Sequence, residues 1–351
     1  MLYITSKKEI KEYRESTALG QSQLKKLLVG MDEFLKEDDF KETLSIHIGK
    51  AVDTILTGNE EDFEDEFYIS RFPKPSDTIA LILETVYEKA IDKRADLETY
   101  EGILAQVIID MEYQKNWKID TRINKLLEFS GYYQELQDSD GKIIITEETK
   151  TIIDSVVDSL RSNPVTQQYF NRVTPTDIDI YLQLPIYWEY KGVQCKSLLD
   201  IVIVQKEVNG DIRNIIPIDL KTMWDKTTNF LSAVKARRYD IQAASYSLAV
   251  AKHFNVPMSK VSEFLFVVES TTDIGHPLVF QCTKELLNVG LKGLPESKYE
   301  QRIIRHKILG YNDLIDLYIY YSKQGWLEEK IIFENNGKLK LTWDKVLGYG
   351  D

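Results

Sequence analysis

The sequence predicts an α/β protein in which one mixed β-sheet is flanked by helices. Three strand-like runs follow one another in the second half of the chain, at 177–190, 194–205 and 214–222. A run with helical periodicity (228–254) and a short apolar run (263–269) come next. The order strand, strand, strand, helix, strand is that of a single α/β core.

Each strand has its own signal in the sequence. Apolar and polar residues alternate over 177–190, as they do in a half-buried strand. Lys191-Gly192 and Asn209-Gly210 mark the turns between the first, second and third strands. The apolar stretch 263–269 has the length of a buried strand, and 278–282 is a further candidate.

Helices are expected on both sides of these strands. Two helices are predicted within 16–56, where Ser22 caps the first, and an acidic stretch at 59–67 ends this segment. The chain up to 163 is mostly helical in pattern, interrupted by two short candidate strands at 132–136 and 142–145. The other predicted helices are 79–93, 99–114, 120–128, 146–162, 283–294 and 297–325.

The expected domain organisation follows from this order of elements. Residues 1–58 are expected to be N-terminal helices that belong to the core, and 59–175 a mainly helical insertion or variable region. Residues 176–351 would hold the core and its C-terminal helices. Length alone leaves one large domain or two smaller ones open.

The composition is that of an ordinary globular protein, with 43% apolar and 28% charged residues. A net charge of −12 argues against extensive coating of nucleic acid. It leaves a nuclease open, because metal sites need carboxylates and DNA contact needs only a local basic face. The N-terminus lacks the apolar stretch of a signal peptide, and no long uncharged apolar run follows. We expect a cytoplasmic protein without membrane contact, in the host cytoplasm if a phage encodes it.

The two cysteines, Cys195 and Cys282, are too few for a four-thiolate zinc site or an iron–sulfur cluster. They are interpreted as small buried hydrophobic residues in a reducing compartment.

The residues that can carry chemistry lie on the second and third strands. Asp219 and Lys221 are two apart, so on a strand their side chains share a face while Leu220 points into the core. Asp200 is a lone carboxylate within an apolar strand, and a hairpin can place it beside the other two. The carboxylates can hold Mg²⁺ or Mn²⁺ for phosphodiester hydrolysis, and the lysine can orient a water or neutralise developing charge. The alternative is a solvated ion pair on the sheet surface.

These residues lie in motifs that resemble those of the PD-(D/E)XK nuclease superfamily, in its RecB-like and RecE-like exonuclease branch. Residues 196–200 and 218–222 are similar to motifs II and III. Gln242 and Tyr246, on one helix face, resemble the Q-x-x-x-Y motif. Residues 49–53 fit the G-x-x-x-H/E/D motif, which ends at Asp53.

Further segments carry the same resemblance. Residues 16–24 resemble the opening of RecE-like domains, and 264–270 and the tail around Trp326 are similar to that group too. Together the matches cover roughly residues 16 to 56 and 175 to 326. Two positions depart from the pattern: Leu199 stands where a proline is frequent, and Asp53 where RecE-like domains usually have histidine.

The resemblance implies a restriction-endonuclease-like fold and a Mg²⁺-dependent deoxyribonuclease, with Mn²⁺ as a substitute metal. The expected activity is a 5′-to-3′ exonuclease on double-stranded DNA ends, in phage-type recombination, repair or replication. The implied metal ligands are Asp53, Asp200 and Asp219. Lys221 would assist the water, and Gln242 and Tyr246 would steady the site and the DNA backbone.

A basic patch of Lys235, Arg237 and Arg238 precedes Gln242, and these four residues are the candidate DNA contacts. A solvated helix face is the equal alternative. Arg302, Arg305, His306 and Lys307 are a weaker second group.

Other functions remain open at the level of sequence. They are an endonuclease of the same fold, a non-catalytic DNA-binding protein, and an interaction protein of a phage replication complex. The resemblance suggests a single-strand annealing protein as partner, and it leaves a homo-oligomer open.

Overall fold

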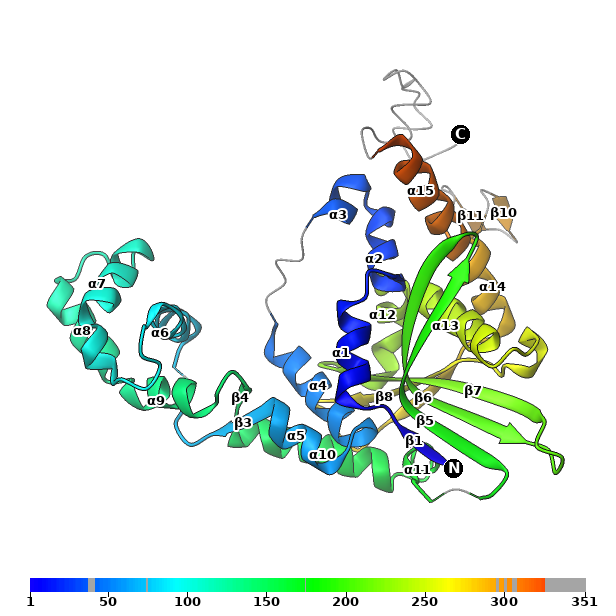
Figure 1. The fold of residues 1–351 in the computed structure, drawn as a ribbon, viewed down its shortest axis with the longest axis horizontal. Coiled ribbons are helices and arrows are strands. Elements are labelled where there is room, and N and C mark those ends of the chain that lie inside the picture. The colour runs from blue at the N-terminus through cyan, green and yellow to red at the C-terminus, as the bar shows by residue number, and fades with distance from the viewer. Residues whose placement is uncertain are drawn as a thin grey trace. The chain divides into compact units, whose positions relative to one another are not determined.

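The computed structural model describes residues 1–36, 42–73, 75–173, 175–294 and 308–325, and the backbone of 297–299 and 302–304. The chain divides into two compact units, whose elements are labelled in Figure 1. The sheet unit comprises residues 1–42, 56–58 and 158–351. The helical unit comprises residues 43–55 and 59–157.

The sheet unit is built on a mixed sheet with the strand order β1-β5-β6-β7-β8-β9 and with β2 beside β6. β5, β6 and β7 are joined antiparallel, and so are β8 and β9, whereas β1–β5, β2–β6 and β7–β8 are parallel pairs. The expectation of a mixed sheet flanked by helices is confirmed. The strands are β1 (Leu2–Ile4), β2 (Leu19–Gly20), β5 (Ile178–Tyr190), β6 (Val193–Lys206), β7 (Ile212–Met223), β8 (Leu265–Ser270) and β9 (Leu278–Gln281).

The central helix of this unit is α13 (Tyr239–His253), in which nearly every residue is buried. Small residues such as Ala243 and Ser245 let it lie close to its neighbours. Gly290 serves the same purpose on α14, because a Cβ there would lie 2.0 Å from the Asp240 carbonyl oxygen. The other helices are α1 (Lys7–Glu15), α2 (Gln21–Lys25), η1 (Lys26–Leu28), α3 (Met31–Leu35), α11 (Gln167–Phe170), η3 (Thr227–Asn229), α12 (Phe230–Arg237), η4 (Met258–Lys260), α14 (Lys284–Lys292) and α15 (Tyr311–Gln324).

The sheet forks at Asp200. β6 pairs with β7 only as far as the partners Ile201 and Ile218, after which β7 continues beside β8 and β6 beside β5. Figure 1 shows the β5–β6 hairpin running on from there toward α15. At its tip Lys191 forms an ion pair with Asp316 of that helix.

A backbone irregularity in β5 lies opposite the fork. Leu182 pairs with Ile201 and Leu184 with Leu199, so that Gln183 and Asp200 lie opposite each other between these two register pairs. Gln183 has φ 52°, a left-handed conformation that costs a non-glycine residue about 1–2 kcal/mol. Such an irregularity bends a strand, and this one is at the point where the hairpin leaves the sheet.

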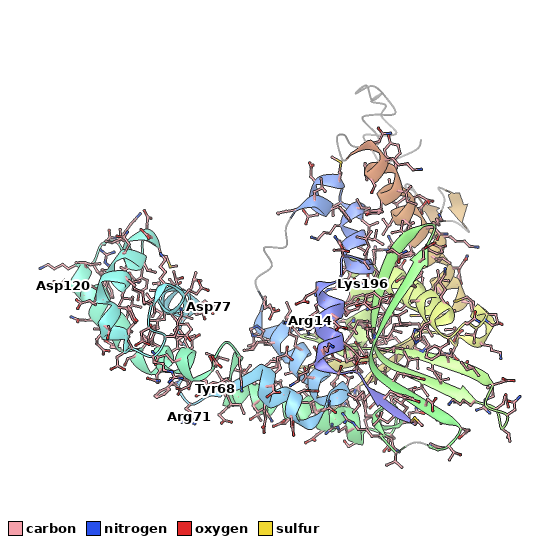
Figure 2. All side chains as sticks on the ribbon, viewed as in Figure 1. Arg14, Tyr68, Arg71, Asp77, Asp120 and Lys196 are labelled. Carbon is pink, nitrogen blue, oxygen red and sulfur yellow. The ribbon has the colours of Figure 1, made fainter. Side chains whose placement is uncertain are left out.

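The N-terminal segment is tied to β6 by Lys196. Its ammonium group donates to the carbonyl oxygens of Tyr13 (2.8 Å) and Ser16 (2.7 Å), at the C-terminal end of α1. Cations at that end of a helix satisfy free carbonyl groups and interact favourably with the helix dipole. Figure 2 labels Lys196 and Arg14, which meet at this junction.

The helical unit packs its helices around a core of its own, lined by Leu83, Leu104 and Tyr133 among others. Its two strands are parallel to each other. The elements are α4 (Leu44–Thr57), α5 (Glu60–Glu66), β3 (Phe67–Ser70), α6 (Asp77–Lys89), η2 (Leu97–Tyr100), α7 (Glu101–Asp110), α8 (Ile119–Leu127), α9 (Ser130–Asp138), β4 (Ile143–Thr146) and α10 (Glu147–Ser162). The helices α4 and α10 begin here and end in the sheet unit.

The structure corrects three expectations about secondary structure. The candidate strand 132–136 lies in the helix α9, where Tyr132 and Leu136 are one turn apart and both buried. The predicted helix 228–254 is two helices, because Arg238 adopts φ 51° between α12 and α13. The predicted helix 297–325 begins only at Tyr311, after the short strands β10 (Ser297–Tyr299) and β11 (Arg302–Ile304).

The division into units also runs differently from the expected limits at 58 and 175. Residues from 158 onward belong to the sheet unit, where the Ser159 hydroxyl donates to the buried carboxylate of Glu269 on β8. Of the helices in the described residues, none combines the length and apolar character needed to cross a membrane.

Candidate nuclease site at the sheet fork

Asp219 and Lys221 lie on β7 just beyond the fork, where this strand has left β6 and pairs with β8. Their side chains share a face, as the spacing predicts, and the Lys221 ammonium contacts Asp219 Oδ2. Asp219 is only 3% exposed. This low exposure excludes the alternative of a solvated ion pair on the sheet surface.

Asp200 occupies the position opposite Asp219, one step beyond the last β6–β7 pair in the same register. Its Oδ2 accepts a hydrogen bond of 2.7 Å from the backbone N–H of Leu220. The carboxylate thus accepts a hydrogen bond from a backbone N–H group of β7 just beyond the last backbone pair between β6 and β7. Asp200, Asp219 and Lys221 are therefore brought together, as the sequence predicts.

Gln242 on α13 reaches the same site from the helix layer. Its amide donates a hydrogen bond of 2.6 Å to Asp219 Oδ1, and both side chains are buried. Asp219 Oδ2, by contrast, has no hydrogen-bond partner in the described residues apart from the ion-pair contact with Lys221. Burial raises the pKa of Asp219, although Lys221 and Gln242 act in the opposite direction.

Lys221 is surrounded by aromatic rings and carboxylates. Its ammonium nitrogen lies 5.2 Å from the ring centre of Tyr239 and 5.9 Å from that of Phe266. Burial disfavours the charged amine, but the nearby carboxylates of Asp219 and Asp200 outweigh burial and raise the pKa of Lys221. Lys221 is therefore a permanent cation at neutral pH.

Tyr246 lies one turn beyond Gln242 and is buried as well. Burial, reinforced by Tyr13 and by the two site carboxylates, raises the pKa of its hydroxyl well above the usual range. Gln21, the first residue of α2, acts on this pKa in the opposite direction. Tyr246 thus stays protonated and is available only as a neutral hydrogen-bonding group.

Asp53 lies on α4, in a part of that helix that belongs to the helical unit. Within the described residues no group of three or more His, Cys, Asp or Glu side chains forms a metal-binding cluster. The sheet unit itself provides two candidate metal ligands, Asp200 and Asp219. The role of Asp53 as a third metal ligand stays a prediction.

A family comparison classifies the domain that holds this site. The family described as "PDDEXK-like domain of unknown function (DUF3799)" matches residues 21–305. The chain belongs to this family. No curated protein matches the chain significantly. Among solved structures, a "putative exonuclease" from Eubacterium rectale matches 98% of this chain and 97% of its own, at 12% identity and a TM-score of 0.44.

Membership confirms the PD-(D/E)XK resemblance at the level of the superfamily. The matched range contains β6, β7 and α13, and with them Asp200, Asp219, Lys221, Gln242 and Tyr246. The assignment to a RecB-like, RecE-like or phage-type branch stays a prediction.

The basic patch of this PDDEXK-like domain is divided between exposed and engaged side chains. Lys235 and Arg237 are exposed on α12. Arg238 donates two hydrogen bonds to Asp240 and a third, of 2.7 Å, to the carbonyl oxygen of Leu309. Arg237 also donates to the Tyr239 hydroxyl (3.4 Å), and Arg238 joins α12 to α13. Contact of this patch with DNA stays a prediction. The second basic group and Trp326 lie outside the described side chains.

Two residues near the site were missed by the sequence analysis. Tyr239 places its ring beside the Lys221 ammonium, and Lys25 at the end of α2 lies near the same ring. The similarity of residues 16–24 to RecE-like openings indicated that this segment matters, but it stops one residue short of Lys25.

Proposed function

We propose that this PDDEXK-like domain is a metal-dependent deoxyribonuclease. The main support is the buried arrangement at the fork, in which Asp200 and Asp219 stand opposite each other and Lys221 contacts one of them. Burying a carboxylate that lacks a full set of donors is costly, so such a site is more often functional than structural.

The residues at the fork fit a divalent metal ion. Mg²⁺ and Mn²⁺ prefer oxygen ligands, and Asp219 Oδ2 is a buried oxygen whose partner in the described residues is the Lys221 ammonium. Asp200 and Asp219 would hold the ion, with Asp53 as the further ligand that the resemblance implies. A metal ion bound there supplies Lewis-acid chemistry and lowers the pKa of water.

The protein groups have separate tasks in this proposal. Gln242 and the Leu220 N–H fix the orientation of the two carboxylates. Lys221, held protonated by its acidic neighbours, neutralises charge that develops on the phosphate and does not act as a general base. Tyr246 contributes a neutral hydroxyl group to the wall of the site.

We propose DNA as the substrate and an exonuclease acting on double-stranded ends as the most specific activity. An endonuclease of the same fold and a non-catalytic DNA-binding protein are the alternatives. The sequence resemblance alone supports four further expectations. They are a role in recombination, repair or replication, a phage origin, a single-strand annealing protein as partner, and a homo-oligomer.

A digestion assay tests the proposal. Purified protein is incubated with linear duplex, circular duplex and single-stranded DNA, each with Mg²⁺, with Mn²⁺ and with a chelator. Degradation of linear DNA alone supports an exonuclease, and nicking of circles supports the endonuclease. Absence of cleavage under all conditions would refute the nuclease and leave a binding role.

A matched pair of variants ties the activity to the site. Lys221→Met keeps the aliphatic stem but removes the charge, and we expect cleavage to fall about 100-fold or more. Lys260→Met is the control, because Lys260 donates to the Ile212 carbonyl oxygen at the opposite end of β7. Equal activity of both variants would contradict the assignment of the site.

A further inference from the structure

Lys25 brings a second ammonium group to the fork from the N-terminal segment. It is the last residue of α2, and it donates a hydrogen bond of 2.9 Å to the carbonyl oxygen of Arg237, the last residue of α12. Its nitrogen lies 5.8 Å from the ring centre of Tyr239. Lys221 lies 5.2 Å from the same ring, so Tyr239 is flanked by two cations.

The carboxylates around Lys25 already have other cationic partners. Asp219 is in contact with Lys221, and Asp240 is held by two hydrogen bonds from Arg238. In the described part of the chain Lys25 forms no ion pair with a carboxylate. Its contact with the Arg237 carbonyl uses one of its three N–H donors.

The electrostatics agree with this description. Burial and the neighbouring charge of Lys221 lower the pKa of Lys25 to about 8, in spite of Asp240 and Asp219. The ammonium group is therefore poorly compensated in the free protein. An additional anion beside it would be stabilised.

We propose that Lys25 binds a non-bridging oxygen of a DNA backbone phosphate next to the one that is cleaved. This proposal rests on the proposed nuclease function, which already requires a phosphodiester at Lys221. A backbone phosphate is the anion that a DNA strand entering this site brings with it. The competing explanation is a purely structural role, in which Lys25 only caps the C-terminal end of α12.

The test measures binding without cleavage. The affinity of the full-length protein for a short blunt DNA duplex is determined in chelator over a series of salt concentrations. Each phosphate contact contributes about 0.9 to the slope of log affinity against log salt. We expect Lys25→Ala to bind more weakly than wild type and to lower the slope by about that amount. Lys25→Arg should keep the wild-type slope, because it keeps the charge.

Two further variants separate phosphate binding from a structural role. Lys25→Gln can still donate to the Arg237 carbonyl but carries no charge, so it should behave like Lys25→Ala. Lys260→Ala also loses a lysine that donates to a carbonyl oxygen, and it should leave the slope unchanged. A wild-type slope in Lys25→Gln, or an equal loss in Lys260→Ala, would overturn the proposal.

The outcome is independent of catalysis. If wild type binds DNA with the expected dependence on Lys25 but cleaves none under Mg²⁺ or Mn²⁺, the nuclease function fails and the phosphate contact stands. If cleavage occurs and Lys25→Gln binds like wild type, the phosphate contact fails alone. A wild-type protein that neither binds DNA in chelator nor cleaves it with Mg²⁺ or Mn²⁺ would refute both.

Discussion

Glu135 in the helical unit and Asp219 in the sheet unit are both hidden from solvent, with 1% and 3% of their surface exposed. Glu135 accepts hydrogen bonds from the Ser70 hydroxyl and from the backbone N–H groups of Arg71 and Phe72. These three neutral donors lie at the end of β3 and just after it, where Figure 2 labels Tyr68 and Arg71. Asp219 instead has one amide donor, from Gln242, on Oδ1 and one ammonium group, from Lys221, on Oδ2. Burial by itself therefore does not distinguish a structural carboxylate from a functional one, whereas the set of donors does.

The strongest test of this contrast is Asp219→Asn. The side chain keeps its size but loses the charge that would hold a metal ion, so we expect cleavage to fall by at least about 1000-fold. DNA affinity in chelator should change little, since no metal is present. The measurement is the initial rate on linear duplex with Mg²⁺. Retention of a tenth or more of the wild-type rate would show that Asp219 is not a metal ligand.

Glu135→Ala tests the structural carboxylate of the comparison. It removes the acceptor of the buried Ser70 hydroxyl and of two partly buried backbone N–H groups, which should destabilise the helical unit by about 1–3 kcal/mol. Urea denaturation measures the change, with Glu88→Ala on the exposed side of α6 as the control. If Glu135→Ala were as stable as that control, the description of Glu135 as a structural carboxylate would be wrong.

A smaller effect is expected at Gln242, which orients Asp219 without itself binding metal in this proposal. Groups of this kind typically change metal affinity or activity 10- to 100-fold when removed, so we expect Gln242→Ala to lie in about that range. Titration of the cleavage rate with Mg²⁺ checks it, because a lost orienting bond should raise the Mg²⁺ concentration required. Gln281→Ala on the exposed strand β9 serves as the control. An unchanged Mg²⁺ requirement would assign Gln242 to packing.

Much of the sheet unit could be predicted because its signals are local. The alternating pattern and the turns define β5, β6 and β7, and the spacing of Asp219 and Lys221 fixes the face that they share. Two determinants of the site have no such signal. Gln183 is not a residue type that indicates a positive φ, and only pairing with β6 and the bend of the hairpin explain its conformation.

Lys25 is the second determinant without a local signal. It reaches the fork only because β2 pairs with β6 at Leu19 and Cys195, far apart in the chain. Its neighbours there are the carbonyl oxygen of Arg237 at the end of α12 and the ring of Tyr239. No local sequence pattern predicts these contacts. The sequence predicts one helix over 228–254 for a related reason, since Arg238, which adopts a positive φ between α12 and α13, is not a glycine.

The smallest expected effect is the pH dependence of DNA binding. It reports on the Lys25 ammonium, which, unlike Asp219, has no oppositely charged partner in contact with it in the described residues. The pKa of Lys25 is lowered to about 8, so in the free protein its ammonium group loses its proton as the pH rises through that value. A bound phosphate favours the charged form, and binding must therefore take up a proton above this pH. We expect the affinity of wild type in chelator to decline several-fold between about pH 7 and pH 9. Arginine stays charged throughout this interval, so Lys25→Arg should lose much less affinity, and Lys25→Gln should show a flat profile from a weaker starting point. Parallel profiles for all three proteins would mean that another group titrates and that Lys25 makes no contact with DNA.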